Sequence, residues 1–143
     1  GRLDYDTSGL LILTNDGELT YRLTHPSYGV DKTYRVWIEG NIPEEILHTL
    51  RNGVHLEDGI TSPAKIRIVK KGNKGKDSTA VEITIHEGKN RQVKRMFEKV
   101  GYPVIGLQRI AFGTLHLDNL LKPGEFRHLL EGEVNDLKKE VGL

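Results

Sequence analysis

Two carboxylates near the start of the sequence are the first residues whose spacing could support chemistry. Asp4 and Asp6 are separated by one residue, so on an extended strand both side chains would point to one face. Such a pair could be the acid and base of a glycosidase-like hydrolase, which needs a defined separation that adjacency does not fix. The stretch from Asp6 to Gly9 is also typical of a turn. The spacing alone leaves a catalytic and a structural interpretation open.

A glycine followed by a cluster of cations forms the second candidate site. Residues 87–97 read Glu-Gly-Lys-Asn-Arg-Gln-Val-Lys-Arg-Met-Phe, with four basic side chains at the start of a predicted helix: Lys89, Arg91, Lys94 and Arg95. The last three are spaced i, i+3 and i+4, on one side of the helix. Cations gain nothing from the positive end of a helix dipole. They suit phosphate binding, or holding a nearby carboxylate ionised; the alternative is a solvated basic face.

A tyrosine in a predicted strand is the third candidate. Tyr34 follows Asp31-Lys32-Thr33 and lies in a run of β-forming residues. A tyrosine in a strand usually packs in the core or against a neighbouring strand. Beside a basic patch, its ring could instead stack on an unpaired nucleic-acid base.

The distribution of charge is more informative than its sum. The chain has 143 residues and a net charge of +1. Residues 65–99 contain eleven Lys and Arg against four Asp and Glu, a local balance of +7, and the remainder carries ten against sixteen, or −6. One basic stretch can neutralise phosphates while the whole chain stays near neutral. A solvated lysine-rich hairpin is the alternative.

Hydrophobic periodicity predicts the elements that must position these residues. β-Forming runs predict strands over 10–13, 33–38, 64–69, 79–85, 104–112 and 115–117. Helical spacing and capping residues predict helices over 18–23, after Pro43 as far as Gly53, and over 90–100 and 131–141. Asn15 or Asp16 is the expected cap of the first helix, and a hairpin is expected at 72–77. The sum is a single α+β domain with a mixed, mostly antiparallel sheet flanked by helices.

Several classes of site and location are disfavoured by composition. The sequence has no cysteine, which excludes disulfides and thiolate metal sites. Its six histidines are scattered without ligand spacing, and no Walker-type phosphate loop is present, so neither a metal nor a nucleotide cofactor is predicted. No apolar run reaches membrane-spanning length and no signal-peptide pattern opens the sequence. A cytoplasmic protein without membrane contact is expected.

The ordered set of motifs resembles a known enzyme family. GRLDYDTSGLL, TNDG, KTY and EGKNRQVKRM, in this order, are similar to the pattern of the RsuA/RluB/RluE/RluF group of bacterial ribosomal-RNA pseudouridine synthases. The resemblance extends over essentially the whole chain, including Gln108 to Leu115. It implies that residues 1–143 form the catalytic domain, without the family's S4-type RNA-binding domain and one further strand. We therefore expect a domain incomplete at its N-terminus, with an exposed strand edge through which copies could self-associate.

The resemblance also implies roles for individual residues. Asp4 falls on the catalytic aspartate, Tyr34 on the tyrosine that packs on the flipped uracil, and Lys94 on the basic partner of the aspartate. Arg91 and Arg95 lie close enough to compete for that last role. Arg2 falls on the motif arginine near the RNA. The residues expected to contact RNA are Arg2, Lys89, Asn90, Arg91 and Arg95.

The reaction implied is the isomerisation of a uridine to pseudouridine in ribosomal RNA. The N1–C1′ bond breaks, the uracil turns, and C5 joins C1′, so no redox cofactor is needed. The resemblance favours 23S RNA of the large subunit, with 16S RNA as the alternative target. A non-catalytic RNA-binding module and a hydrolase using Asp4 and Asp6 are the competing functions.

Overall fold

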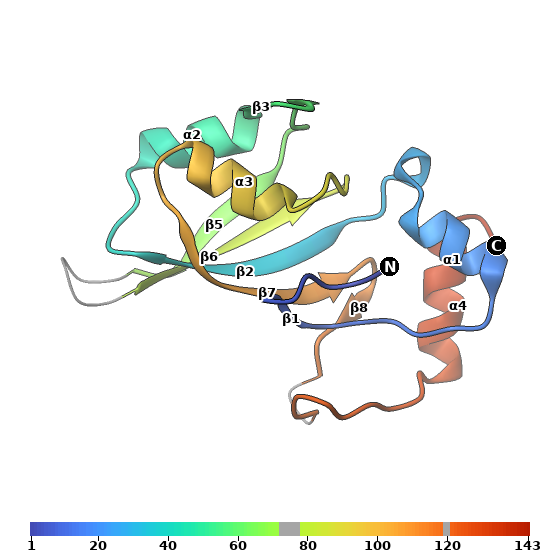
Figure 1. The fold of residues 1–143 in the computed structure, drawn as a ribbon. Helices are drawn as coiled ribbons and strands as arrows, with labels where there is room; N and C mark the ends of the chain where they lie inside the picture. The colour runs from blue at the N-terminus through green and yellow to red at the C-terminus, as the bar shows by residue number, and fades with distance from the viewer. Residues whose placement is uncertain (72–77, 119–120) are drawn as a thin grey trace.

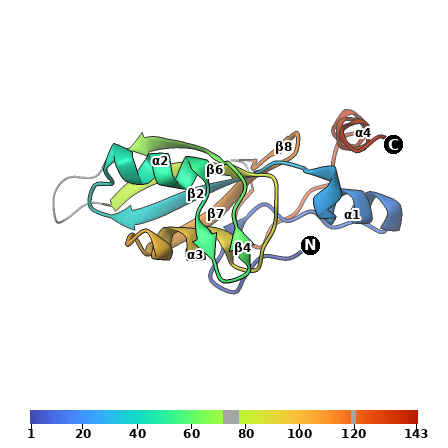
Figure 2. The same cartoon turned by 90° about the horizontal axis from the view of Figure 1, so that it is seen from above.

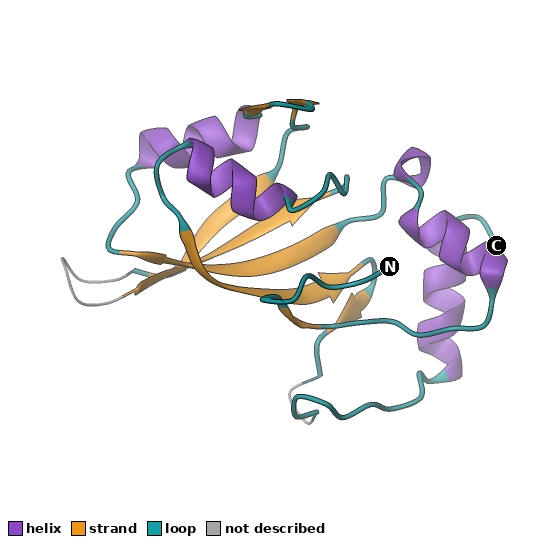
Figure 3. Cartoon of the chain, viewed as in Figure 1, coloured by secondary structure: helices purple, strands orange, loops and turns teal. Residues whose placement is uncertain are grey.

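The computed structural model describes residues 1–71, 78–118 and 121–143. Within these residues the chain forms a six-stranded mixed sheet with the order β1-β7-β2-β6-β5, and β8 pairs with β7 (Figures 1 and 3). The strands of this sheet are β1 (Ser8–Gly9), β2 (Lys32–Glu39), β5 (Lys65–Lys70), β6 (Ser78–Ile85), β7 (Val104–Phe112) and β8 (Leu115–His116). Only the β1–β7 pairing is parallel among those described. The predicted α+β fold with a mostly antiparallel sheet is confirmed.

Local sequence signals account for two of the helix ends. The helices are α1 (Gly17–Thr24), α2 (Glu44–Asn52), α3 (Gln92–Lys99) and α4 (Glu131–Glu140), with a short 3₁₀ turn, η1, over Pro26–Tyr28. Asp16 caps α1 by accepting a hydrogen bond from the Leu19 amide at 3.1 Å. Gly53 ends α2 with a φ of 117°, a conformation that side-chain-bearing residues rarely adopt. None of the helices in the described residues is long and apolar enough to cross a bilayer.

The first hydrophobic core lies between one face of the sheet and the pair α2 and α3. Both views place these two helices on the same side of the sheet (Figures 1 and 2). Alternate residues of β2 and β6 point toward them, including Val36, Ile38, Val81 and Ile83. Met96 and Phe97 of α3 are fully buried against these strands. This core fixes α3, and with it the basic segment, against the centre of the sheet.

A second core lies at the other end of the sheet. Helices α1 and α4 lie side by side there in both views (Figures 1 and 2). Leu23 of α1 and Leu137 of α4 pack together with Phe112 and Leu115, which close β7 and begin β8. The end of β7 therefore belongs to the second core, whereas Leu107 in its middle belongs to the first.

Two expectations about local structure are wrong. Residues 10–13 do not form a buried strand, because β1 ends at Gly9 and the side chain of Leu13 is 81% exposed. The Leu10 amide still donates to the Arg109 carbonyl, and Leu10 and Ile12 then pack on the second core while Leu11 faces out. The helix expected from residue 90 begins at Gln92 instead, because Arg91 has a φ of 50°.

Two hairpins remain to be compared with the sequence-based predictions, one that was not predicted and one that lies outside the described residues. The short hairpin of β3 (His55–Leu56) and β4 (Gly59–Ile60) was not predicted, since two-residue strands carry no periodic signal. The hairpin expected at 72–77 lies outside the described residues. The other predicted strands and helices are present, with bounds that differ by one or two residues.

Candidate active site

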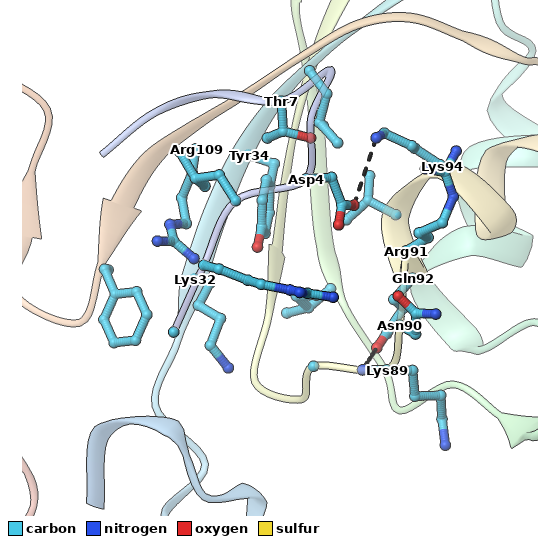
Figure 4. Close-up of a pocket in the computed structure, with 18 of the residues that line it drawn as sticks. Asp4, Thr7, Lys32, Tyr34, Lys89, Asn90, Arg91, Gln92, Lys94 and Arg109 are labelled. Atoms are coloured by element: carbon cyan, nitrogen blue, oxygen red, sulfur yellow. Dashed lines mark hydrogen bonds and ion pairs between the residues drawn. The ribbon is translucent and has the colours of Figure 1, made fainter. Parts of the chain in front are cut away.

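A pocket of about 250 Å³ lies where the start of the chain, the ends of β2 and β7, and the approach to α3 meet (Figure 4). Its lining includes seven of the eight predicted site residues: Arg2, Asp4, Tyr34, Lys89, Asn90, Arg91 and Lys94. The fold thus brings the three separate sequence motifs to one place. Among the described lining residues, Asp4 is the one carboxylate, and six others carry cationic side chains.

A tight turn presents Asp4 to the pocket. The Thr7 amide donates to the Asp4 carbonyl at 3.0 Å, which closes a turn over residues 4–7. The next two residues, Ser8 and Gly9, pair with Gln108 and Arg109 of β7. This pairing anchors the turn to the sheet, so the position of the Asp4 side chain is set by β7.

Lys94 is the cation that faces this carboxylate. Its Nζ atom lies 3.5 Å from Asp4 Oδ2 and also donates a hydrogen bond to Asp6 Oδ1. Figure 4 shows Lys94 reaching from α3 toward Asp4. A buried ammonium is stable only when it is paired, and these two carboxylates supply the pairing. Of the three cations that sequence placed near Asp4, the structure brings Lys94 to it.

Asp6 is the second carboxylate of the N-terminal pair, and it points out of the pocket. Its side chain is 57% exposed and is not part of the pocket lining. The hydrogen bond from Lys94 lowers the pKa of the Asp6 carboxyl. Asp6 therefore holds Lys94 from the outside rather than facing a substrate across from Asp4, which argues against a hydrolase that uses the two as an acid–base pair.

A buried polar clamp shapes the loop that leads into α3. The Gln92 side-chain carbonyl accepts from the Lys89 amide at 3.0 Å, and its amide group donates to Glu87 at 2.8 Å. Glu87 also accepts from the Ser62 amide at 2.6 Å. The clamp holds the loop in a shape in which Arg91 adopts a left-handed conformation, which costs a residue other than glycine roughly 1–3 kcal/mol. Asn90 and Arg91 consequently line the pocket.

Arg95 is the predicted site residue that the structure places elsewhere. Its guanidinium forms two hydrogen bonds with Asp58, at 2.8 and 3.1 Å, and a third with the Asn90 carbonyl. It therefore braces the β3–β4 hairpin against α3 and does not line the pocket. The expectation that Arg91, Lys94 and Arg95 share one helix face is wrong, because Arg91 precedes the helix and consecutive helical residues diverge.

Comparison with known families settles the assignment of the chain. The model of the RNA pseudouridylate synthase family matches residues 1–99. The chain belongs to this family. The matched region contains Asp4, Tyr34 and Lys94.

Similar proteins extend the family relationship over almost the whole chain. Ribosomal large subunit pseudouridine synthase B of Bacillus subtilis (strain 168) is 49% identical over 138 residues, covering 96% of this chain and 56% of that protein. Ribosomal small subunit pseudouridine synthase A of Vibrio cholerae is 43% identical over 141 residues, covering 97% of this chain and 58% of that protein. The chain thus spans a little more than half the length of these relatives.

A solved structure shows the same fold. A crystal structure of a pseudouridylate synthase superimposes with a TM-score of 0.87 at 40% sequence identity, covering 96% of this chain and 57% of that chain. The pseudouridylate synthase family fold therefore accounts for the mixed sheet and the flanking helices together.

The structure also adds pocket residues that sequence reasoning missed. Lys32 and Arg109 both line the pocket, and Lys32 lies two residues from Tyr34 on the same face of β2. That alternation could have identified Lys32 from the sequence, whereas Arg109 lies outside the motifs that indicated the site. Within the described residues, no group of three or more His, Asp or Glu side chains is placed to hold a metal ion.

Proposed function

We propose that this chain carries the catalytic domain of a ribosomal-RNA pseudouridine synthase, which isomerises a uridine to pseudouridine. The observation that supports the activity most directly is the pairing of Asp4 with Lys94 in a pocket whose lining also includes Tyr34 and five further cationic side chains. Membership of the RNA pseudouridylate synthase family supports the same reaction.

The pocket has room for a single base and not for a duplex. Its volume of about 250 Å³ is just below the usual range for small-molecule sites. A uridine in folded RNA must therefore be extruded from its stack before it can reach Asp4. Tyr34 lies in the pocket, half-buried against the first core, so its ring is held rigidly for stacking on the extruded base. The surrounding cations then attract the RNA backbone.

In this proposal Asp4 acts as an anion, either attacking the nucleoside or abstracting a proton. The Lys94 ammonium at 3.5 Å stabilises that negative charge and fixes its position. Over the whole reaction the N1–C1′ bond breaks and a C5–C1′ bond forms. The proton lost from C5 is balanced by one gained at N1, so the mass of the RNA does not change.

For the target RNA we propose the large ribosomal subunit. The support is the 49% identity with the large-subunit enzyme of Bacillus subtilis, against 43% with the small-subunit enzyme of Vibrio cholerae. Because these values are close, 16S RNA is the second candidate. A cytoplasmic location belongs to the same proposal, since ribosomal RNA is the substrate.

The deciding experiment maps pseudouridines in ribosomal RNA from cells with and without the gene. Loss of one carbodiimide-reactive position from 23S RNA is the expected result, and loss from 16S RNA would select the second candidate. In vitro, isomerisation leaves the RNA mass unchanged and creates a carbodiimide-reactive base. A hydrolase would leave an abasic site, and an RNA-binding module would leave the RNA unchanged. Either of these last two results would refute the proposed reaction.

A further inference from the structure

One wall of the pocket is formed by paired residues of β2 and β7. Lys32 lies opposite Phe112 and Tyr34 lies opposite Arg109 in the register of these two strands. Lys32 and Tyr34 share a face because they are two residues apart, and cross-strand partners share the face of their neighbours. All four side chains therefore face the pocket, as its lining also indicates.

A β-bulge makes this arrangement possible. The register of β7 shifts between Thr33 and Tyr34, so that Ile110 is an extra residue with no partner on β2. Arg109 and Phe112 are three residues apart and would otherwise point to opposite faces of the sheet. Bulges commonly redirect side chains beside active sites, and this one brings the Phe112 ring onto the pocket face that Arg109 and Leu107 already share.

Two cations in this wall have no acidic partner at contact distance within the part of the chain that the structure describes. Arg109 is only 5% exposed, and its Nε atom donates to the Leu10 carbonyl at 2.9 Å. Its Cζ atom lies 5.0 Å from the centre of the Phe112 ring, and Lys32 Nζ lies 5.8 Å from the same centre. Across the described residues, no carboxylate forms an ion pair with either side chain. Asp31 and Glu87 act on Lys32 only from a longer distance.

The two positive charges also act on each other. Burial is the main cause that lowers the pKa of the Lys32 ammonium, and the neighbouring Arg109 lowers it further. Lys94, in contrast, is neutralised by two carboxylates. Arg109 is buried and Lys32 is half-buried, and neither is paired with a carboxylate of the described residues. Keeping these two cations together has an energetic cost that a bound anion would remove. The wall is thus arranged in advance for a negatively charged group.

We propose that Lys32 and Arg109 bind a phosphate of the nucleotide whose base stacks on Tyr34. The proposal rests on the proposed function for the identity of that nucleotide. Lys32 and Tyr34 are about 6.7 Å apart along the strand, which leaves space for a ribose between base and phosphate. A guanidinium and an ammonium converging on one phosphate provide charge-assisted hydrogen bonds. Anchoring the backbone there would position C1′ relative to Asp4.

Binding of mononucleotides measures the phosphate contribution directly. Calorimetric titration of the protein with uridine, uridine 5′-monophosphate and uridine 3′-monophosphate separates the base from each flanking phosphate. We expect at least one of the monophosphates to bind about tenfold more tightly than uridine. The monophosphate with the advantage identifies which flanking phosphate is held.

Matched variants test whether the tighter binding of the monophosphate depends on Lys32 and Arg109. Lys32→Met should remove most of the phosphate-dependent gain and leave uridine affinity within about twofold, since only the anion contact is lost. Arg109→Lys keeps the charge of a buried residue and should weaken the gain while preserving the fold. Arg67→Met removes a cation from β5, outside the pocket, and should leave all three affinities unchanged.

Two results would overturn the inference. One is monophosphate binding that is no tighter than uridine binding, and the other is an equal effect of Lys32→Met on uridine and monophosphates. Isomerisation of RNA is measured on the same preparations to keep the two proposals apart. An active enzyme without a phosphate advantage refutes only the phosphate site. A phosphate advantage without pseudouridine formation refutes only the proposed reaction.

Discussion

Lys94 is more deeply buried than the carboxylate it faces: 9% of its side chain is exposed, against 31% for Asp4. The cation is therefore fixed by the packing of α3, and the carboxylate meets it from the pocket side. A rigid positive charge beside a partly solvated carboxylate can stabilise the anion without closing off access to it. This relationship is the basis of the first two predictions.

Asp4→Asn should abolish isomerisation and leave the fold intact. The change removes the negative charge while keeping the shape of the side chain, so a loss of roughly a thousandfold or more is expected. Pseudouridine formation by carbodiimide mapping and thermal unfolding of the same sample test the two parts. Turnover within about tenfold of the parent would show that Asp4 is not the catalytic carboxylate.

Lys94→Met should lower activity by orders of magnitude, because the charge that stabilises Asp4 is lost. Lys94→Arg keeps the charge and should be better tolerated. Arg91→Met and Arg95→Met serve as comparisons on the same segment, and kcat/KM is the measured quantity. If either comparison variant is more damaging than Lys94→Met, the assignment of the partner to Asp4 is wrong.

Tyr34→Phe should be milder than Tyr34→Ala if the ring stacks on uracil, because stacking uses the face of the ring and not the hydroxyl. Tyr34 packs against the first core, so the alanine variant will also lose stability. Tyr34→Leu, which fills part of the space without an aromatic face, separates stacking from packing. Equal and severe losses of kcat in the phenylalanine and alanine variants would mean that the hydroxyl takes part in the chemistry.

Arg95→Met should lower stability more than catalysis, by about 2–5 °C in Tm, because Arg95 braces the β3–β4 hairpin through Asp58. The hydrogen bond from Arg95 lowers the pKa of Asp58. A carboxyl with a lowered pKa contributes stability above its unfolded-state pKa and loses it as the pH falls through the folded-state value. The difference in Tm between the parent and Arg95→Met should therefore be largest at neutral pH, where Asp58 is ionised, and should become smaller below about pH 4. A difference that does not change with pH would exclude this pair as its cause.

Gly9→Ala should reduce both stability and activity. Gly9 has a φ of 112°, and a methyl group there would come within 2.6 Å of the Arg109 backbone nitrogen. The parallel pairing of β1 with β7 would be forced apart, and that pairing anchors the turn carrying Asp4. Gly17→Ala is the matched control, since it lies in α1 with nothing within 4 Å. Wild-type activity and Tm in Gly9→Ala would show that the turn does not depend on this close approach.

Much of the fold could be predicted because its signals are local. The alternation of β2, the capping of α1 by Asp16 and the glycine after α2 each depend on neighbouring residues only. The run at residues 10–13 was misread because an apolar stretch in a strand and one in an extended loop look alike in sequence. Its side chains are divided between the second core and solvent, which depends on α1 and α4.

The residues of the candidate site that lie in sequence motifs could be predicted, whereas a residue whose placement depends on the register of the strands could not. Asp4, Tyr34 and Lys94 were named from their motifs and line one pocket. Phe112 reaches the same pocket only because Ile110 is bulged, and no sequence pattern predicts that shift. Lys94 and Arg95 are adjacent in sequence yet contact different carboxylates, a division decided by the angle between consecutive helical residues.

The pocket lies between two cores that are packed separately, so its two sides can open independently in the native state. Lys94 is held by the core beneath α3, whereas Phe112 belongs to the core that includes α1 and α4. Because separately packed units can open with different free energies, the two halves of the pocket need not share one protection level in amide hydrogen exchange. A nucleotide that touched both halves would couple their opening equilibria. Slower exchange would then extend into α4, whose residues do not line the pocket.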